Sequence, residues 1–303
     1  IERVRQGKER MDIQTASSIA QDALNHLKKS RSVKIAVVAG SLRRMKETVR
    51  DVDILATSSD PSKAMKSFLA WPTVDRVLAE GRTKSAILTR DGVQVDLRVL
   101  DEKSFGAGLL YFTGSKEHNV RLRQWAMKKG LKVNEYGLFD ARGRCLASLE
   151  EKDIYKKLGL DFIEPELRED AGEIQAAASK TLPRLIRLDD LRGDLHVHTD
   201  YSDGRSSLVE MVDGARALGY EYVCLTDHSE SLKVAGGLDK KMLKKKKAQI
   251  DKLNAKLKGF RVLFGTEVEI DAEGRLDYDA ATLASFDIVI AAIHSGFKQT
   301  RSQ

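Results

Sequence analysis

"VKIAVVAGSLRRMKETVRDVDILAT" (residues 33–57) combines two apolar segments with a polar connection that contains Gly40 and Ser41. Each segment has the length and the β-branched residues that are typical of a buried strand. Side chains alternate along a strand, so Asp51 and Asp53 share one face while Val52 points to the core. The stretch therefore predicts two strands, a Gly-Ser turn after the first, and two carboxylates on one face of the second.

A third carboxylate follows in "SAILTRDGVQVDLRVL" (residues 85–100), which predicts a β-hairpin around Asp91 and Gly92. Alternation along its second strand puts Asp96 on the polar face. If this strand neighbours residues 51–57, three carboxylates meet, and they repel one another unless cations neutralise them. Oxygen ligands favour Mg²⁺, and two such ions can support phosphoryl transfer.

The polar connection supplies groups that can contact a phosphate. A Gly-Ser turn before a short helix offers backbone N–H groups and a hydroxyl, and Arg43 and Arg44 add charge-assisted hydrogen bonds. A lone Asp-x-Asp is more often a pair of surface aspartates. The upstream Gly-Ser and the third aspartate favour catalysis instead, and together these residues resemble the nucleotidyltransferase superfamily.

"LLYFTGSKEHNVRLRQWAMKKG" (residues 109–130) resembles the incoming-nucleotide subdomain of family X DNA polymerases. The resemblance implies a catalytic set that holds Mg²⁺ or Mn²⁺: Asp51, Asp53 and Asp96. Asp96 would accept the primer proton. It also implies a nucleotide-binding set: Gly40, Ser41, Arg44, Tyr111, Phe112, Gly114, Asn119 and Arg123. On residue type alone, the Tyr-Phe pair could equally be two buried aromatic side chains. Gln94 stands where family members often carry Arg, so we expect different hydrogen bonding around the third aspartate.

Histidines mark a second site. In "DLHVHTDYSDG" (residues 194–204), His196 and His198 share one face of a predicted strand. Later apolar segments are followed by His or Glu, as expected of ligands at the carboxyl ends of barrel strands. A single histidine at a strand end is more often a core residue, but the recurrence favours a site for Mn²⁺, Zn²⁺ or Fe²⁺. The expected ligands are His196, His198, Asp203, His228, Glu267 and His294.

This pattern resembles the PHP (polymerase and histidinol phosphatase) family of metal-dependent phosphoesterases. The resemblance implies a distorted TIM-like α/β barrel, to which the alternation of strands and helices after residue 192 also points. Family barrels run further and carry later ligands, so we expect an incomplete barrel in residues 192–303. Asp227 also matches a family position.

The expected fold is therefore an α+β nucleotidyltransferase palm with a mixed sheet, a helical nucleotide-binding subdomain and an α/β PHP barrel. The predicted boundaries are 1–30 for the end of an upstream helix-hairpin-helix DNA-binding region, 31–103 for the palm, 104–163 for the nucleotide-binding subdomain, 164–191 for a linker and 192–303 for the N-terminal part of the PHP domain.

Composition agrees with these expectations. The chain has 303 residues, 42% of them hydrophobic, which suits about two globular domains. The formal net charge of +7 favours a polyanionic partner. The lysine run at 240–247 is more often a solvated helix face than a DNA contact. Two distant cysteines and the lack of a membrane-length apolar run fit a cytoplasmic protein without a membrane partner.

The resemblance implies a DNA-directed DNA polymerase that fills short gaps in base-excision repair. Its partners would be gapped or primed DNA and deoxynucleoside triphosphates, and the PHP domain would act as a 3′–5′ exonuclease or end-processing enzyme. Three alternatives remain: an RNA-tailing or small-molecule nucleotidyltransferase, a PHP phosphoesterase whose palm is only a DNA-binding platform, and a structural DNA-binding protein.

Overall fold

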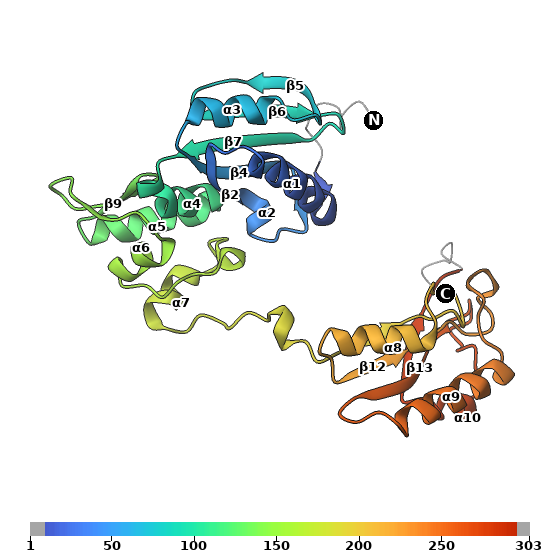
Figure 1. Ribbon diagram of the computed structural model, residues 1–303. Helices are drawn as coiled ribbons and strands as arrows, with labels where there is room; N and C mark the ends of the chain where they lie inside the picture. The colour runs from blue at the N-terminus through green and yellow to red at the C-terminus, as the bar shows by residue number, and fades with distance from the viewer. Residues whose placement is uncertain (1–9, 296–303) are drawn as a thin grey trace. The chain divides into compact units, whose positions relative to one another are not determined.

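A computed structural model describes residues 10–295 of the chain. The chain divides into two compact units, Ile1–Arg184 and Leu185–Gln303, and each is described by itself. Figure 1 shows a mixed α/β unit at the amino-terminal end and an α/β unit at the carboxy-terminal end. Among the described residues, no helix is both long and apolar enough to cross a membrane.

A five-stranded mixed sheet forms the centre of the first unit. Its strand order is β2-β4-β7-β6-β5, and only the β4–β7 pair is parallel. The strands are β2 (Val33–Val38), β4 (Asp51–Ser58), β5 (Val74–Ala79), β6 (Lys84–Thr89) and β7 (Gln94–Leu100). This confirms the two predicted strands and the hairpin, although β2 is only half-buried rather than fully buried.

Two helices, α1 (Ile13–Lys28) and α3 (Pro61–Leu69), pack against one face of this sheet (Figure 1). Each begins at an aspartate whose side chain accepts a hydrogen bond from the first turn, Asp12 for α1 and Asp60 for α3. Residues of α1 such as Ala20 and Leu27 belong to the same core as Val52 of β4. The helix is therefore part of this unit and not the end of a separate upstream region, while residues 1–9 lie outside the described part.

The next segment is helical, as predicted, with a small sheet that the sequence did not reveal. Its helices are α4 (Phe105–Thr113), α5 (Lys116–Lys128) and α6 (Glu151–Lys157). Three antiparallel strands follow the order β10-β9-β8: β8 (Lys132–Asn134), β9 (Gly137–Phe139) and β10 (Cys145–Ala147). Short elements elsewhere are α2 (Gly40–Arg43), the pair β1 (Met11–Asp12) and β3 (Thr48–Val49), and 3-10 helices at Glu102–Ser104, Pro165–Leu167, Leu188–Asp190 and Lys233–Ala235.

The predicted linker at 164–191 begins too early. Helix α7 (Glu173–Ser179) packs Ile174 and Ala177 into the core of the helical segment. Glu173 also accepts a hydrogen bond from the buried His118 ring, with 2.6 Å between Oε1 and Nδ1. These buried contacts attach α7 to the first unit, because a free linker would leave them in water.

Four parallel strands in sequential order form the sheet of the second unit: β11 (Gly193–Val197), β12 (Tyr222–Leu225), β13 (Arg261–Glu269) and β14 (Ile288–Ala292). Its helices are α8 (Leu208–Ala217), α9 (Lys240–Asn254) and α10 (Ala280–Leu283). Apolar residues of α8 and α9, such as Val212 and Ile250, share a core with Val223 and Val262 of the strands. The predicted parallel α/β alternation is confirmed, and the carboxyl ends of the strands share one edge.

A buried ion-pair network connects α2 and α6. Glu151 accepts hydrogen bonds from Arg43 Nη2 at 2.6 Å and from Arg168 Nη1 at 2.7 Å. Arg168 is fully buried. Breaking a buried pair leaves an uncompensated charge, so its removal is far more costly than the loss of a surface pair.

We expect Glu151→Gln to lower the free energy of unfolding of the first unit by roughly 3–5 kcal/mol, since two guanidinium groups lose their carboxylate. Urea titration followed by tryptophan fluorescence measures this unit alone, because Trp71 and Trp125 both belong to it. Glu150→Gln is the matched control, since Glu150 forms an exposed pair with Lys152 and should cost less than about 1 kcal/mol. Equal midpoints for the two variants would contradict the prediction.

Candidate functional site

The three aspartates meet where β4 and β7 pair. Asp53 lies opposite Asp96 in the parallel register, and Asp51 lies opposite Gln94. All three aspartates are half-buried, while Val95 and its apolar neighbours point into the core on the other face. The grouping expected from alternation is therefore present, and it depends on the parallel pairing of these two strands.

Burial and mutual repulsion make the charged forms of Asp51 and Asp53 unfavourable. Burial first, and then the charges of Asp51 and Asp96, raise the pKa of Asp53 to about 7. Burial and the charge of Asp96 also raise the pKa of Asp51. The Gln94 side chain donates a hydrogen bond to Asp96 at 2.8 Å. A group of half-buried carboxylates in which Asp51 and Asp53 have elevated pKa values fits divalent cations, which would neutralise the charge.

Gly40 lies directly against this cluster. Its φ of +61° is unfavourable for other residues, and a Cβ at this position would lie 2.0 Å from Asp53 Oδ2. Ser41 follows in α2 and is half-buried. The turn thus brings backbone close to the carboxylates, as the predicted phosphate contact requires.

The two arginines after the turn have protein partners. Arg43 forms the ion pair with Glu151 and donates to Thr113 Oγ1 at 2.6 Å. Its contact with a phosphate stays a prediction. Arg44 donates to Glu169 Oε1 at 2.7 Å and to the Thr113 carbonyl at 2.6 Å. Both side chains connect α2 to the helical segment.

The aromatic pair at the end of α4 approaches the aspartates. Phe112 lines a cavity of about 60 Å³ together with Asp53 and Asp96. The Arg98 guanidinium lies 4.5 Å from the centre of the Phe112 ring, and the Tyr111 ring meets it edge-on at 5.1 Å. Phe112 is therefore not a simple core residue, because it shares a cavity with two carboxylates.

The remaining predicted nucleotide contacts lie on α5 or next to it. Asn119 Nδ2 donates to the Tyr111 carbonyl at 2.7 Å, and Arg123 Nε donates to the Asn119 carbonyl at 3.3 Å. Gly114 has a φ of +73°, and a Cβ there would lie 3.1 Å from Arg44 Nη1. Two backbone carbonyls thus connect Tyr111, Asn119 and Arg123, and Gly114 lies beside Arg44.

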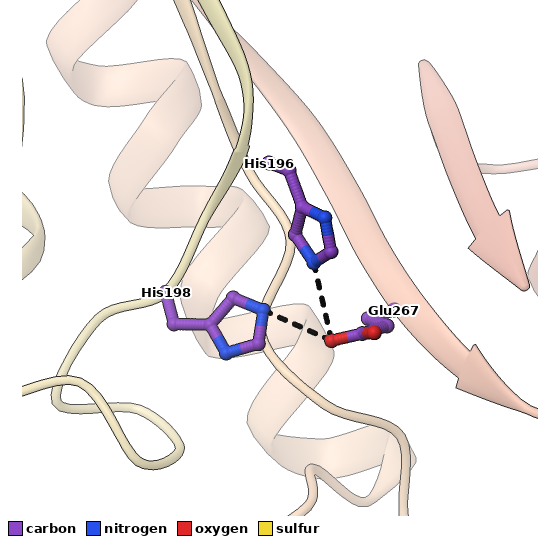
Figure 2. Close-up of side chains that lie close together, drawn as sticks. All are labelled: His196, His198 and Glu267. Carbon is purple, nitrogen blue, oxygen red and sulfur yellow. Dashed lines mark ion pairs between the residues drawn. The ribbon is translucent and has the colours of Figure 1, made fainter. Parts of the chain in front are cut away.

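The second cluster surrounds Glu267 of β13. Its Oε2 lies 3.2 Å from His196 Nε2 and 3.1 Å from His198 Nε2, as Figure 2 shows. His228 Nδ1 approaches the same oxygen at 3.3 Å, and His294 Nε2 lies 3.6 Å from Oε1. The structure thus brings all the predicted strand-end residues together.

Asp203 completes this cluster from the loop after β11. Its carboxylate lies 2.8 Å from His198 Nδ1 and 3.5 Å from His228 Nε2. The ligand atoms form three overlapping groups in which every atom lies within 4.8 Å of the others: His196, His198 and Glu267; His198, Asp203 and His228; and His228, Glu267 and His294.

The donor atoms fit metal ions. His198 Nε2 and His228 Nδ1 are buried, and each lies within 3.3 Å of Glu267 Oε2, but neither makes a hydrogen bond of acceptable geometry to any described residue. A buried polar atom without a partner is costly, and a cation would satisfy it. Burial, followed by the charge of His198, lowers the pKa of His228 and keeps its imidazole neutral, the form that binds metals. Mixed imidazole and carboxylate ligands suit Zn²⁺, Mn²⁺ or Fe²⁺.

Sequence reasoning missed two residues of this region. Glu269 is buried and pairs with His294 Nδ1; it lies two residues after Glu267, so alternation along β13 contains the signal for it. Lys246 belongs to the lysine run that was expected to be solvated, yet it is fully buried beside Asp227. The expectation is wrong for this lysine, because it faces the sheet.

A mixed sheet that presents three aspartates beside a glycine turn, followed by a parallel α/β unit with a histidine-rich cluster, is the arrangement expected of a nucleotidyltransferase with a PHP domain. The sequence comparisons agree. Residues 108–169 match the family model described as DNA polymerase beta thumb, and residues 194–303 match the PHP domain model.

Curated relatives extend the match across the chain. "DNA polymerase/3'-5' exonuclease PolX" of Bacillus subtilis (strain 168) is 40% identical over 96% of this chain and 51% of its own length. DNA polymerase lambda of Rattus norvegicus is 30% identical over 45% of this chain and 29% of its own length. Through these matches the chain is similar to the family X DNA polymerases that carry a PHP domain. It spans about half the length of the Bacillus relative.

The elevated pKa of Asp53 predicts a stability effect. Because the folded pKa of about 7 exceeds the ordinary value of 3.8, the protonated form favours folding, and this contribution is lost as pH rises through 7. At pH 8 without divalent cations, Asp53→Asn should therefore raise the free energy of unfolding by roughly 1–3 kcal/mol. At pH 4, where Asp53 is protonated, the two proteins should differ little.

Urea titration with tryptophan fluorescence in EDTA, and then in excess Mg²⁺, measures this effect. Mg²⁺ should stabilise the wild-type protein more than the variant, since the variant lacks one ligand. Asp75→Asn, at an exposed position of β5 in the same sheet, controls for the loss of a negative charge. If the wild-type protein were as stable as the Asp53→Asn variant at pH 8 in EDTA, the repulsion between Asp53 and the neighbouring carboxylates would be disproved.

Proposed function

We propose that the chain is a DNA-directed DNA polymerase whose nucleotidyl transfer takes place at Asp51, Asp53 and Asp96. The observation that carries this proposal is the cavity that Asp53, Asp96 and Phe112 line together, because the carboxylates would hold metal ions there and Phe112 would flank the nucleotide. In this reading, residues 31–103 are the palm, and the segment from residue 104 contains the nucleotide-binding subdomain.

Two Mg²⁺ or Mn²⁺ ions would supply charge neutralisation and activation of the primer 3′-hydroxyl. The three aspartates would hold them, and Asp96, oriented by the Gln94 hydrogen bond, would accept the hydroxyl proton. Gly40 and Ser41 would offer backbone N–H groups and a hydroxyl to the triphosphate, because the turn lies against Asp53. Arg44 would contribute positive charge beside them.

The rest of the nucleotide would lie along α4 and α5. Tyr111 and Phe112 would flank the sugar and disfavour a ribose 2′-hydroxyl, and the position of Phe112 beside Asp53 supports this. Asn119 and Arg123 would reach the base pair. The net charge of +7 supports a DNA substrate, and filling of short gaps in base-excision repair is the role we propose.

The second unit would cleave phosphodiesters at the cluster around Glu267, as a 3′–5′ exonuclease or end-processing activity. Its six candidate ligands, and the two buried imidazole nitrogens without a hydrogen bond to the described residues, support transition-metal binding. The Bacillus relative carries both activities in its name, which favours the same pair of functions here. The unit would be a PHP domain, as the match of residues 194–303 supports.

Asp96→Asn should reduce primer extension on a one-nucleotide gap by roughly 10²–10⁴-fold with the fold intact, because it removes a metal ligand and the proton acceptor. Single-turnover extension with Mg²⁺ and a deoxynucleotide measures this. Asp91→Asn in the exposed β6–β7 turn is the matched control. Wild-type extension by Asp96→Asn would rule out this site, and preference for an RNA primer would favour the RNA-tailing alternative.

The two chemistries should separate by mutation. His198→Ala should abolish Mn²⁺-stimulated removal of 3′-terminal nucleotides and leave gap filling near the wild-type rate, since the aspartates lie in the other unit. Asp53→Asn should have the opposite effect. Labelled gapped and single-stranded DNA, assayed with both proteins, distinguish the outcomes. If nuclease activity were lost with Asp53→Asn and kept with His198→Ala, the assignment of cleavage to the histidine cluster would be wrong.

A further inference from the structure

Lys246 differs from the other lysines of its run because it is fully buried. Its ammonium group has three acceptors: Asp227 Oδ2 at 2.8 Å, the Leu225 carbonyl at 2.9 Å and the Gly265 carbonyl at 3.2 Å. An ammonium group has three donors, so all of them are used. The side chain thereby links α9 to the carboxyl end of β12 and to the middle of β13, two residues before Glu267.

The partner carboxylate reaches into the loop after β11. Asp227 is fully buried, and its Oδ1 accepts from the Thr199 backbone N–H at 2.7 Å and from the Ser202 hydroxyl at 2.8 Å. The Thr199 hydroxyl also donates to Asp227. One carboxylate therefore fixes both ends of the turn 199–202, and Lys246 balances its charge.

Each residue held by this pair adjoins a member of the metal cluster. His198 precedes Thr199, Asp203 follows Ser202, and His228 follows Asp227 in sequence. The Thr266 hydroxyl, next to Glu267, donates to the Asp227 carbonyl at 3.2 Å. Movement of the pair would shift four ligand-bearing positions together.

We propose that Lys246 and Asp227 are positioning residues that set the geometry of the histidine cluster without binding a metal themselves. The inference rests on the proposed metal site. A buried ion pair is weak evidence for stability, since apolar replacements of similar size are often tolerated. Asp227 supplies one shared acceptor for the Thr199 N–H and the Ser202 hydroxyl, so its role is geometric.

Two charge-free double variants isolate that role. Lys246→Met/Asp227→Asn removes the ion pair and retains an acceptor for the turn. Lys246→Met/Asp227→Leu removes the ion pair and the acceptor together. Lys247→Met is the control from the same run, since Lys247 is half exposed and pairs with Asp251 on the surface. All proteins carry Asp53→Asn, so that the aspartate cluster contributes little metal binding.

Two readouts are needed, Mn²⁺ affinity from the electron paramagnetic resonance signal of free Mn²⁺, and amide hydrogen exchange of residues 199–203 without metal. We expect the Leu double variant to bind Mn²⁺ about tenfold or more weakly and to exchange faster, because loss of a residue that orients ligands typically costs about 10–100-fold in affinity. The Asn double variant and Lys247→Met should stay close to the parent protein.

Equal Mn²⁺ affinity and equal exchange in the Asn and Leu double variants would overturn the inference, as would failure of both to fold, which would make the pair a stability element. If the parent protein binds no Mn²⁺, the proposed metal site is wrong. The positioning role would then be judged by hydrogen exchange alone, and unchanged protection of residues 199–203 in the Leu double variant would overturn it.

Discussion

The parallel pairing of β4 with β7 is the constraint on which the first unit depends. In the observed register Asp53 faces Asp96, and the apolar residues between the aspartates point to the helices. A slip of one residue would turn Asp96 into the core and Val95 to the solvent. The core and the carboxylate cluster are therefore two faces of one hydrogen-bonded pair, and neither can be changed without the other.

Alternation explains why much of this could be predicted from the sequence. It gave β4, the β6–β7 hairpin and the shared face of the aspartates, and in the second unit the strand ends that carry the histidines. The pairing of β4 with β7, which are far apart in the sequence, remained a hypothesis until the structure gave their register. Strands of three residues, such as β8, are too short to show a period, so they were missed.

Buried charges were the other failure of prediction. Arg43 and Lys246 look like solvent-facing basic residues in the sequence, yet each pairs with a buried carboxylate, Glu151 and Asp227 respectively. A charge is stable inside a protein only when its partner comes from another element, and the sequence does not show which element that is. The same reason hides α7, whose contacts come from residues far away in the chain.

Buried carboxylates fall into two groups in this protein, those compensated by a cation and those that are not. Around Glu151 and Asp227, cations from neighbouring elements compensate the carboxylates, and these positions hold turns and helices in place. Around Asp53 no such partner is close enough to prevent a pKa near 7, and around Glu267 the neighbours are imidazoles, two of which have buried nitrogens without a hydrogen bond to the described residues. Compensated charges thus support the structure, whereas the uncompensated ones mark the places where an external cation would complete it. This distinction separates the compensated ion pairs from the two candidate metal sites, and it follows from the cost of leaving a buried polar group unsatisfied.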